Sequence, residues 1–495
     1  MKTLSSKYYG ENGIHRVPLW RIAGFACNNL ATNLYLCLMN VVAYYLIGFV
    51  GVAVVTASSF SMMMRIWDGV TDPIIGFVVD KTDGKFGKNR PFMVIGNVIL
   101  CTMSFVLYHV THLLPENTAI RFAFFIVVSA IYYIGYTFQC VVTKSAQTCL
   151  TNDPKQRPLF SIFDGCYNTF MFIGFQALLA SISAKYGGSF YEAGLFHELW
   201  MIIATLSAIL TIIAVISIAP KDRREFFGTG KVVKVGLKDY WDTLKNNRAI
   251  QMLVVSASTD KLANTTKTST VTAVLFGVVV GNFALSASIQ GFTAIPTLIL
   301  TMFAIGTLAT RLGQRKAMLI GSWGGIIVNA LLAALWIFGD PKTMANANGG
   351  INWGFFTITH VLLSILLGAL TGISGNIVIP MTADCADYEV YRTGKYVPGM
   401  MGTLFSFVDK IISSLAPMIA GLAYAAVGYA DKLPDASATY TPALHYVSVF
   451  LMYGMVILGL ICNVIALKFY PLTKEKMAEI QGEIAAIKAK AMAES

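Results

Sequence analysis

Two carboxylates lie inside an apolar stretch of the chain that is long enough to cross a lipid bilayer. Asp68 and Asp72 are four residues apart in SMMMRIWDGVTDPIIGFVVDKTDGKFGKNRP, residues 61–91. On a helix this spacing places both side chains on one face, one turn apart. Each carboxylate costs roughly 2.5–3.5 kcal/mol at the centre of a bilayer. We therefore predict that the pair binds a cation inside a transporter.

The chemistry of the pair leaves the transported ion open. A hard cation such as Na+ prefers a small cage of oxygen ligands, which carboxylates and hydroxyls supply. Without a cation, two carboxylates one turn apart repel each other, so one of them should hold a proton. Na+, Li+ and H+ all fit, and no cofactor is expected. The alternative is a salt-bridge cluster that only holds helices together, but ionisable groups within a membrane favour a functional role.

The composition is that of a polytopic membrane protein. Of the 495 residues, 56% are hydrophobic and 13% are charged, which is too apolar for a soluble protein. Apolar stretches that could each span a lipid bilayer recur along the chain, and the predicted fold class is an all-α protein with twelve transmembrane helices. The predicted spans are residues 22–48, 52–79, 92–112, 122–150, 159–184, 199–219, 249–280, 284–308, 317–338, 353–382, 400–429 and 443–467.

The basic residues predict the orientation of the chain in the plasma membrane. Of the 37 Lys and Arg residues, 28 fall in the two tails and the even-numbered connections, four in the odd-numbered connections and five inside spans. Short connections rich in Lys and Arg face the cytoplasm, so both termini are predicted to be cytoplasmic. The net charge of +11 then reflects membrane topology, and no nucleic-acid partner is expected.

A repeated basic turn divides the chain into two halves. GFVVDKTDGKFGKNRP begins at Gly76 after the second span, and GTLATRLGQRK begins at Gly306 after the eighth. Two six-span halves with matching inner loops are typical of a parallel repeat. We predict an N-terminal six-helix bundle over 1–219, a cytoplasmic linker over 220–248, a C-terminal six-helix bundle over 249–468 and a cytoplasmic tail over 469–495.

This arrangement resembles the major facilitator superfamily. More narrowly, RIWDGVTDPIIGFVVDKTDGKFGKNRPF, residues 65–92, and the turn TNDPKQRP, residues 151–158, resemble the glycoside-pentoside-hexuronide:cation symporters, the group of the sodium/melibiose symporter. The resemblance covers nearly the whole chain. It implies symport of a glycoside or other sugar-type solute with a cation by alternating access. No enzymatic activity is expected, and we expect a monomer.

The resemblance also implies roles for residues outside the second span. In that family the two span-2 aspartates form the coupling-cation site, to which span 4 adds a hydroxyl that matches Thr137. A lysine of span 11 matches Lys410, and if it lies close to the carboxylates it would compete with the cation and act in coupling. Thr71 stands where the family often has an asparagine, and it is a further candidate ligand.

The sugar-binding residues of the family are only partly matched. Relatives carry carboxylates in spans 1 and 4. The span-1 position holds Asn29 or Thr32, depending on a short gap. The span-4 position holds Cys140, next to Gln139, and Asp164 stands near the place of an arginine expected in span 5. These residues are candidates for solute binding, but the identity of the solute does not carry over from the family.

The seventh span is unusually polar, with the sequence SASTDKLANTTKTSTVT at residues 256–272. Lipid cannot face most of it, so it should line a water-filled cavity. Asn264 and Lys267, together with Lys144 of span 4, are candidates for binding an acidic group such as a uronate. The alternative is that each lysine pairs with a nearby aspartate: Lys261 with Asp260, Lys410 with Asp409, and Lys144 with Asp164.

Charged residues near the span ends are candidates for an inner gate. Exposed ion pairs contribute roughly 0–1 kcal/mol each, which is enough to bias a balanced equilibrium. Isolated surface charges are the alternative. Two other functions also remain open: transport of a non-sugar organic anion or amphipathic solute on the same scaffold, and a membrane sensor without transport. The gate candidates are Arg65, Asp80, Lys81, Arg157, Asp384 and Asp387.

Overall fold

The computed structural model describes residues 16–81, 86–151, 156–223, 244–393, 407–480 and 482–483. Within these ranges the chain is mostly helical and contains no strand, and an isolated bridge pairs Ala345 with Ile351. The all-α prediction is therefore confirmed. The chain forms two compact units: Met1–Lys231 with Tyr429–Ser437, called unit 1, and Val232–Gly428 with Ala438–Ser495, called unit 2.

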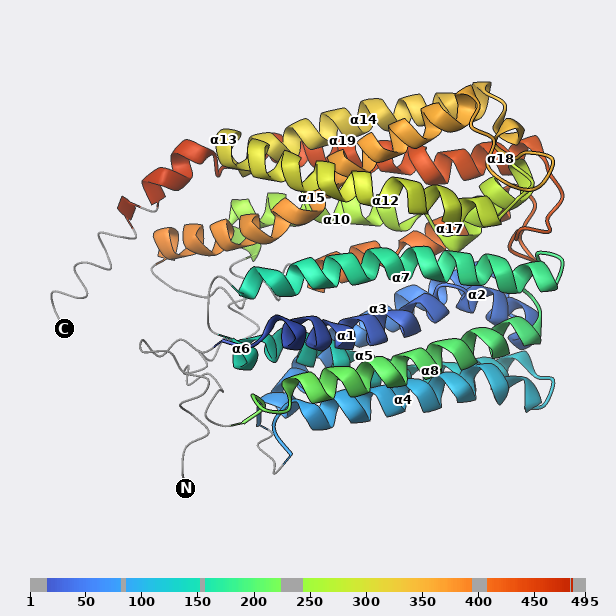
Figure 1. Ribbon diagram of the computed structural model, residues 1–495, viewed down its shortest axis with the longest axis horizontal. Coiled ribbons are helices and arrows are strands. Elements are labelled where there is room, and N and C mark those ends of the chain that lie inside the picture. The colour runs from blue at the N-terminus through green and yellow to red at the C-terminus, as the bar shows by residue number, and fades with distance from the viewer. Residues whose placement is uncertain are drawn as a thin grey trace. The chain divides into compact units, whose positions relative to one another are not determined.

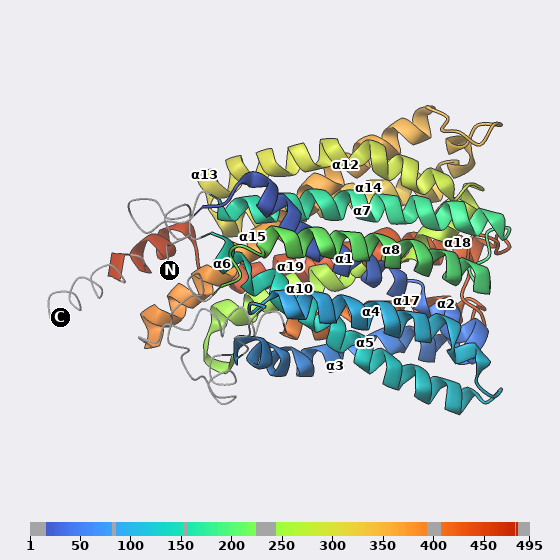
Figure 2. The same cartoon turned by 60° about the horizontal axis from the view of Figure 1, so that its bottom comes forward.

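Unit 1 is a bundle of long helices (Figure 1, blue to green; Figure 2). Helix α1 packs against α7 and α8, and α5 packs against α3 and α4. Short segments, α2 (Val42–Tyr45), a π-helix (Leu46–Val50) and α6 (Gln147–Leu150), extend α1 and α5. The long helices are α1 (Leu19–Met39), α3 (Val54–Lys81), α4 (Arg90–His109), α5 (Thr118–Ser145), α7 (Arg157–Lys185) and α8 (Ala193–Ile218).

Unit 2 is a second bundle, in which α10 packs against α19, and α15 against α12 and α14. Its α15 has 39 residues, about 58 Å at 1.5 Å per residue, and so extends well beyond a hydrocarbon core. Its helices are α10 (Arg248–Thr265), α11 (Ser269–Thr272), α12 (Ala284–Ala304), α13 (Thr310–Leu312), α14 (Gln314–Phe338), α15 (Phe355–Thr393), α17 (Ala416–Ala426), α18 (Pro442–Val449) and α19 (Met455–Phe469).

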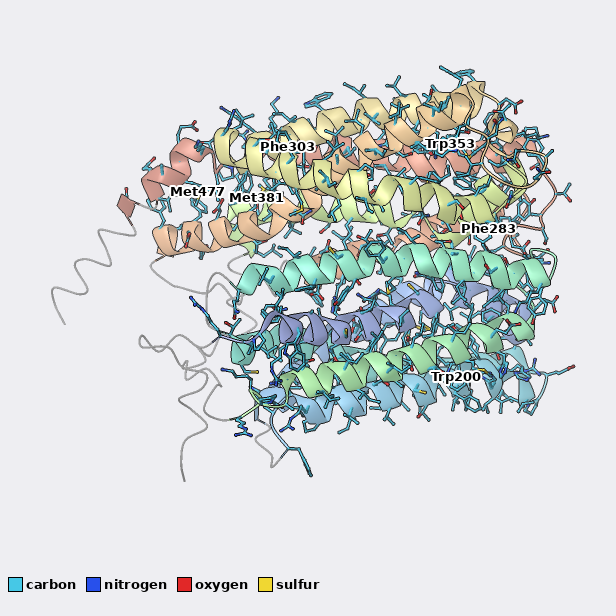
Figure 3. All side chains as sticks on the ribbon, viewed as in Figure 1. Trp200, Phe283, Phe303, Trp353, Met381 and Met477 are labelled. Atoms are coloured by element: carbon cyan, nitrogen blue, oxygen red, sulfur yellow. The ribbon has the colours of Figure 1, made fainter. Side chains whose placement is uncertain are left out.

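Ten helices of the described residues are long and apolar enough to cross a bilayer, and each coincides with a predicted span. The two predicted spans without such a helix correspond to α3 and α10, which carry most of the intramembrane charges. The count of twelve spans thus stays a prediction. Large apolar side chains on the outer helix faces fit a lipid environment; Phe303 of α12, labelled in Figure 3, is 69% exposed.

A short segment from far along the chain completes unit 1. Residues Tyr429–Ser437 follow α17 in sequence but belong to unit 1 by their contacts. The buried Asp435 accepts a hydrogen bond from the backbone N–H of Phe190 at 3.0 Å, and the Tyr44 hydroxyl donates to the carbonyl of Pro434 at 2.8 Å. These contacts fix the segment against the ends of α2 and α7.

Candidate cation and solute sites

The Asp68 carboxylate lies in the interior of unit 1, where α3 packs against α5. Its side chain is fully buried, and the Thr137 hydroxyl of α5 lies 2.8 Å from its Oδ1 atom. The same hydroxyl lies 3.0 Å from the carbonyl oxygen of Tyr133, so it can donate to either acceptor. The hydroxyl oxygen keeps lone pairs for a cation in both cases. The structure thus brings together the predicted acid and the predicted hydroxyl.

Arg65 also belongs to this site rather than to a surface pair. Its Nη1 atom lies 3.7 Å from Asp68 Oδ2, one turn away along α3. Its guanidinium carbon also lies 5.9 Å from the centre of the Tyr136 ring. A guanidinium in this place has two partners, a carboxylate and an aromatic face. Its predicted role in a gate stays untested, but its position makes it a neighbour of the candidate cation ligand.

The remaining predicted ligands, Thr71 and Asp72, follow Asp68 on α3. The Thr71 hydroxyl donates to the backbone carbonyl of Asp68 at 3.1 Å, which leaves its oxygen lone pairs available. Asp72 follows Asp68 by one turn and is partly exposed. Within the described ranges no group of three or more His, Cys, Asp or Glu residues could hold a metal ion. The oxygen atoms of Asp68, Thr137 and Thr71 are hard ligands, of the kind that cations such as Na+ prefer.

Two of the predicted solute residues are engaged in helix packing. Gln139 of α5 is 1% exposed and donates to the carbonyl of Met93 on α4 at 2.6 Å. Thr32 is also 1% exposed and donates to the carbonyl of Asn28 on its own helix at 2.9 Å. Cys140 is partly exposed, and the side chain of Lys144 lies outside the described residues.

Asn29 and Asp164 do meet, across the contact between α1 and α7. The Asn29 amide lies close enough to interact with the Asp164 carboxylate. One turn further along both helices, Asn33 donates to Asn168 through an Nδ2–Oδ1 contact of 2.8 Å. The sequence reasoning missed Asn33 and Asn168. Their spacing of four residues from Asn29 and Asp164, respectively, is the signal that could have found them.

Unit 2 carries a second set of intramembrane charges, on a helix that is interrupted. Helix α10 ends at Thr265 and α11 begins at Ser269, so Lys267 lies in the break. Asp260 is 7% exposed and accepts from the Asn264 amide at 3.1 Å, and its charge is close enough to interact with Lys267. Broken helices of this kind often line sites near the middle of transporters.

The alternative in which Lys261 pairs with an aspartate named the wrong partner. Lys261 forms an ion pair with Asp409, a residue of the segment that precedes α17, and not with its neighbour Asp260. A contact between α10 and the eleventh span explains the difference, because side chains that follow each other on a helix point in different directions. Lys410 belongs to unit 2, and its role in coupling stays a prediction.

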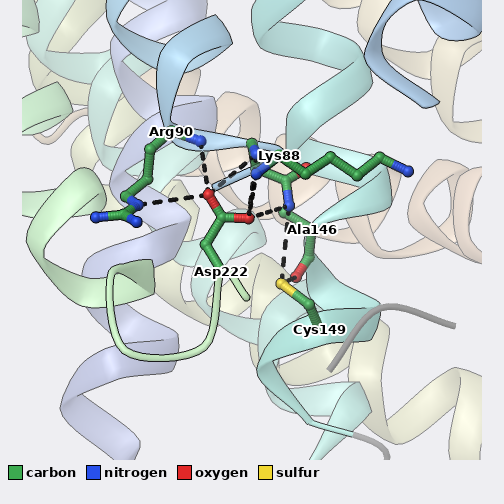
Figure 4. A network of polar contacts seen from close by, with 6 residues as sticks. Lys88, Arg90, Ala146, Cys149 and Asp222 are labelled. Carbon is green, nitrogen blue, oxygen red and sulfur yellow. Dashed lines mark hydrogen bonds and ion pairs between the residues drawn. The ribbon is translucent and has the colours of Figure 1, made fainter. Parts of the chain in front are cut away.

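A buried acid at the end of unit 1 was not predicted. Asp222 follows α8, is 1% exposed and accepts from the backbone N–H groups of Lys88, Asn89 and Arg90 at 2.9–3.1 Å (Figure 4). The Asn89 amide adds a bond of 2.9 Å, and the Nε atom of Arg90 lies 3.5 Å away. Gly87, with a φ of 93°, leaves the room that Asp222 needs. Asp222 therefore caps the N-terminus of α4.

The gate candidates of unit 2 lie on the long C-terminal extension of α15. Burial and the neighbouring Asp387 raise the pKa of Asp384 to about 6. Further along, Glu389 accepts from Asn247 at 2.9 Å and forms an ion pair with Arg392 at 2.7 Å. The side chains of Asp80, Lys81 and Arg157 lie outside the described residues.

The long apolar helices, the two bundles and the buried acid define a membrane transporter, and comparison with known proteins gives its family. The chain belongs to the family described as "MFS/sugar transport protein", which matches residues 24–474. Membership of a transporter family agrees with the expectation that the protein is not an enzyme.

Named relatives and a solved structure share most of the chain. It is 23% identical to the "Glucuronide carrier protein homolog" of Escherichia coli (strain K12), over 94% of this chain and 95% of that one. It is also 23% identical to the "Putative glycoside/cation symporter YagG" of the same organism, over 90% of each chain. The crystal structure of nucleoside transporter NupG superimposes with a TM-score of 0.57 at 14% identity, over 91% of this chain and 100% of that one. This likeness confirms the major facilitator fold.

Proposed function

We propose that the protein is a secondary active symporter that carries a glycoside-type solute with a cation across the plasma membrane. The observation that carries the proposal is the buried Asp68 carboxylate, met by the Thr137 hydroxyl at 2.8 Å inside a membrane-spanning bundle. The names of two relatives, a glycoside/cation symporter and a glucuronide carrier homolog, support the solute class and the coupling. Both termini would face the cytoplasm.

The cation would bind to oxygens of Asp68, Asp72 and Thr137, with the Thr71 hydroxyl as a further ligand. Arg65, at 3.7 Å, would balance the charge of Asp68 while the site is empty. When the cation arrives, the guanidinium can turn towards the Tyr136 ring, which it already approaches at 5.9 Å. Such an exchange gives the site two states that differ in cation affinity, as coupling requires.

Transport would follow by alternating access, in which the solute site opens to one side of the membrane at a time. A sodium ion that enters down about 100 mV releases roughly 2.3 kcal/mol, and its concentration gradient adds to this. Lys410 would couple cation release to the change of state. The charges at the inner ends, Asp384 and Asp387 among them, would bias the equilibrium between states by small amounts.

Counterflow in proteoliposomes tests the proposal directly. Proteoliposomes that contain the purified protein are loaded with an unlabelled nitrophenyl glycoside of glucose, galactose, xylose or glucuronic acid. Entry of the same glycoside in labelled form is then followed in Na+, in Li+ and at several pH values. We expect at least one glycoside to exchange and one cation to lower its KM. If none exchanges in any ion while the protein elutes as a folded species, the protein is not a glycoside symporter.

Substitution of Lys267 tests whether the transported solute is neutral or acidic. It lies in the break between α10 and α11, where its charge could meet a uronate. We expect Lys267→Gln to reduce uptake of a glucuronide at least tenfold more than uptake of the matching glucoside. Lys261→Gln is the matched control, because this lysine of the preceding helix α10 is paired with Asp409. Equal losses for both solutes in Lys267→Gln would contradict an acidic solute.

A further inference from the structure

Two histidines from neighbouring helices of unit 1 meet at the end of α4 that lies away from Asp222. His109 is the last residue of α4, and His197 lies near the start of α8, which packs against α4. The Nε2 atom of His109 is 2.8 Å from the Nδ1 atom of His197. Neither ring belongs to the candidate cation or solute sites.

The contacts of His109 fix which of its ring nitrogens carries a hydrogen. Its Nδ1 atom lies 3.1 Å from the carbonyl oxygen of Phe105. A carbonyl oxygen can only accept, so Nδ1 carries the hydrogen and donates it. The lone pair of the neutral ring is then on Nε2, the atom that faces His197. Metal-binding histidines commonly show this pattern, in which the nitrogen that does not bind the metal donates to a backbone carbonyl.

Aromatic side chains hold the His109 ring in one orientation. The Phe105 ring stacks on it with the ring centres 4.5 Å apart, and the ring of Trp200, labelled in Figure 3, lies at 5.2 Å and nearly perpendicular to it. The Trp200 indole N–H in turn donates to the Ser104 hydroxyl at 3.1 Å. A side chain that is already fixed loses little conformational entropy when it binds a ligand.

The space between the two nitrogens is accessible and has dimensions close to those of a metal site. His197 is exposed and His109 is partly exposed, so an ion can approach from solvent. Metal–imidazole bonds of about 2.0–2.1 Å separate two nitrogens on one ion by roughly 2.9–3.4 Å when the angle at the metal is about 90–109°. The observed 2.8 Å lies just below this range, and a small rotation of the exposed His197 ring reaches it.

We propose that His109 and His197 form a binding site for a divalent transition-metal ion of the Zn2+ type, which bridges α4 and α8. Imidazole nitrogens select Zn2+, Ni2+ and Cu2+ over Mg2+ and Ca2+, which prefer oxygen ligands. No group of three or more His, Cys, Asp or Glu residues lies together in the described ranges, so water completes the coordination. The site is separate from the proposed transport and does not depend on it.

Metal binding at this pair needs no net loss of protons. As the contact stands, His197 donates its Nδ1 hydrogen to the Nε2 atom of His109. When the ion binds, this proton passes through solvent to the Nε2 atom of His197, and the Nδ1 lone pair that it leaves binds the metal. Both rings stay neutral, which is the form of histidine that ligates metals.

Titration calorimetry with ZnCl2 on the full chain in detergent, after removal of any affinity tag, tests the site. We expect one Zn2+ to bind per chain in the wild type, with a Kd that rises at least about tenfold in His109→Gln and in His197→Gln. NiCl2 should bind with the same stoichiometry, and MgCl2 should give no binding heat. Saturating Zn2+ should raise the melting temperature of the wild type by about 2–4 °C and leave both variants unchanged.

His112→Gln is the matched control, because it removes an imidazole from the same end of unit 1. The Nδ1 atom of His112 contacts the Tyr45 hydroxyl at 3.4 Å rather than a second histidine. The Kd for Zn2+ should therefore stay within about twofold of the wild-type value. His109→Gln and His197→Gln each remove one ligand, so either of them carries the test if the other does not elute as a folded species.

The spectrum of bound Cu2+ adds a readout of the ligands themselves. Electron paramagnetic resonance of the protein with one equivalent of CuCl2 should show two imidazole nitrogens in the wild type and at most one in either variant. If Zn2+ gives no binding heat with the wild type, or binds equally well to His197→Gln, the pair is only a hydrogen bond between two helices and the inference is wrong. Loss of binding in His112→Gln would also overturn the assigned ligands. None of these outcomes bears on glycoside exchange, which is measured separately.

Discussion

Asp68 and Asp222, two of the buried aspartates of unit 1, have surroundings that differ in kind. Asp222 is 1% exposed and is held by backbone N–H groups of Lys88, Asn89 and Arg90. Asp68 is fully buried and has the Thr137 hydroxyl at 2.8 Å and the Arg65 guanidinium at 3.7 Å. Three donors to Asp222 are backbone groups fixed in a helix terminus, whereas Thr137 and Arg65 contact Asp68 through side chains that can rotate away.

This difference separates an acid that stabilises the fold from one that can exchange partners. Backbone donors at a helix N-terminus cannot leave without loss of the helix end, so Asp222 is bound permanently. A hydroxyl and a guanidinium can change rotamer, so the Asp68 carboxylate can accept a cation in their place. We therefore expect substitution of Asp222 to lower the stability of the fold, and substitution of Asp68 to impair transport.

The largest effect on transport is expected at Asp68. Asp68→Asn keeps the shape of the side chain and removes the charge that a cation needs. We expect cation-driven accumulation of the transported glycoside to fall at least 100-fold, while the melting temperature changes little, because the Thr137 hydroxyl can still donate to the amide oxygen. Accumulation is measured in proteoliposomes with an imposed cation gradient. Accumulation that stayed ion-driven in the variant would show that Asp68 is not a coupling ligand.

The largest effect on stability is expected at Asp222. Asp222→Ala leaves three backbone N–H groups and the Asn89 amide without their acceptor and leaves Arg90 without its ion-pair partner. Loss of one partner from a buried, charged network costs about 3–5 kcal/mol, so thermal unfolding in detergent should shift strongly downwards.

Asp222→Asn sharpens this result, because it keeps one acceptor oxygen and should lose less stability than Asp222→Ala. Uptake per folded molecule should be unchanged in both variants. An Asp222→Ala protein with wild-type stability and impaired coupling would show that Asp222 acts in transport rather than in stabilising the fold.

The sequence predicted Asp68 more readily than Asp222, for a physical reason. A carboxylate inside an apolar span is conspicuous because the membrane makes it costly, and its partner Asp72 follows at a helical spacing. Asp222 stands in PKDRR, where charges are expected to be solvated. Its burial depends on a contact with residues more than 130 positions earlier, which no local pattern contains.

Contacts between distant residues also limit the prediction of the residues that bind the solute. Asp164 and Asn29 were predicted from the resemblance to a family. The hydrogen bond between Asn33 and Asn168 depends on how α1 packs against α7, which the sequence does not contain. The partner of Lys261 likewise depends on a helix contact rather than on sequence neighbours. Residue types and helical periods predict the helices and their charged faces, whereas pairings between helices need the packed structure.

A smaller effect at Thr137 tests whether the Asp68 site is built for a cation. Thr137→Val removes the hydroxyl that lies 2.8 Å from Asp68 and nearly keeps the volume of the side chain. We expect the cation concentration for half-maximal uptake to rise about tenfold, with the sugar KM changed less than twofold at saturating cation. Thr137→Ser should restore most of the affinity. An unchanged cation dependence in Thr137→Val would remove the hydroxyl from the ligand set.

The smallest effect is expected at Asp384, a third acid. The like charge of Asp387 lies close to it. Burial and Asp387 raise its pKa to about 6, above the value of about 4 in an unfolded chain. The folded state therefore favours the protonated form, so this contribution to stability is present below about pH 4 and is lost as the pH rises through about 6. Asp384→Asn should raise the melting temperature by about 2 °C at pH 7.5 and leave it unchanged at pH 4. A gain at both pH values would mean that the amide improves packing, whereas a loss at pH 7.5 would mean that the charged form of Asp384 is stabilised, as in Asp222.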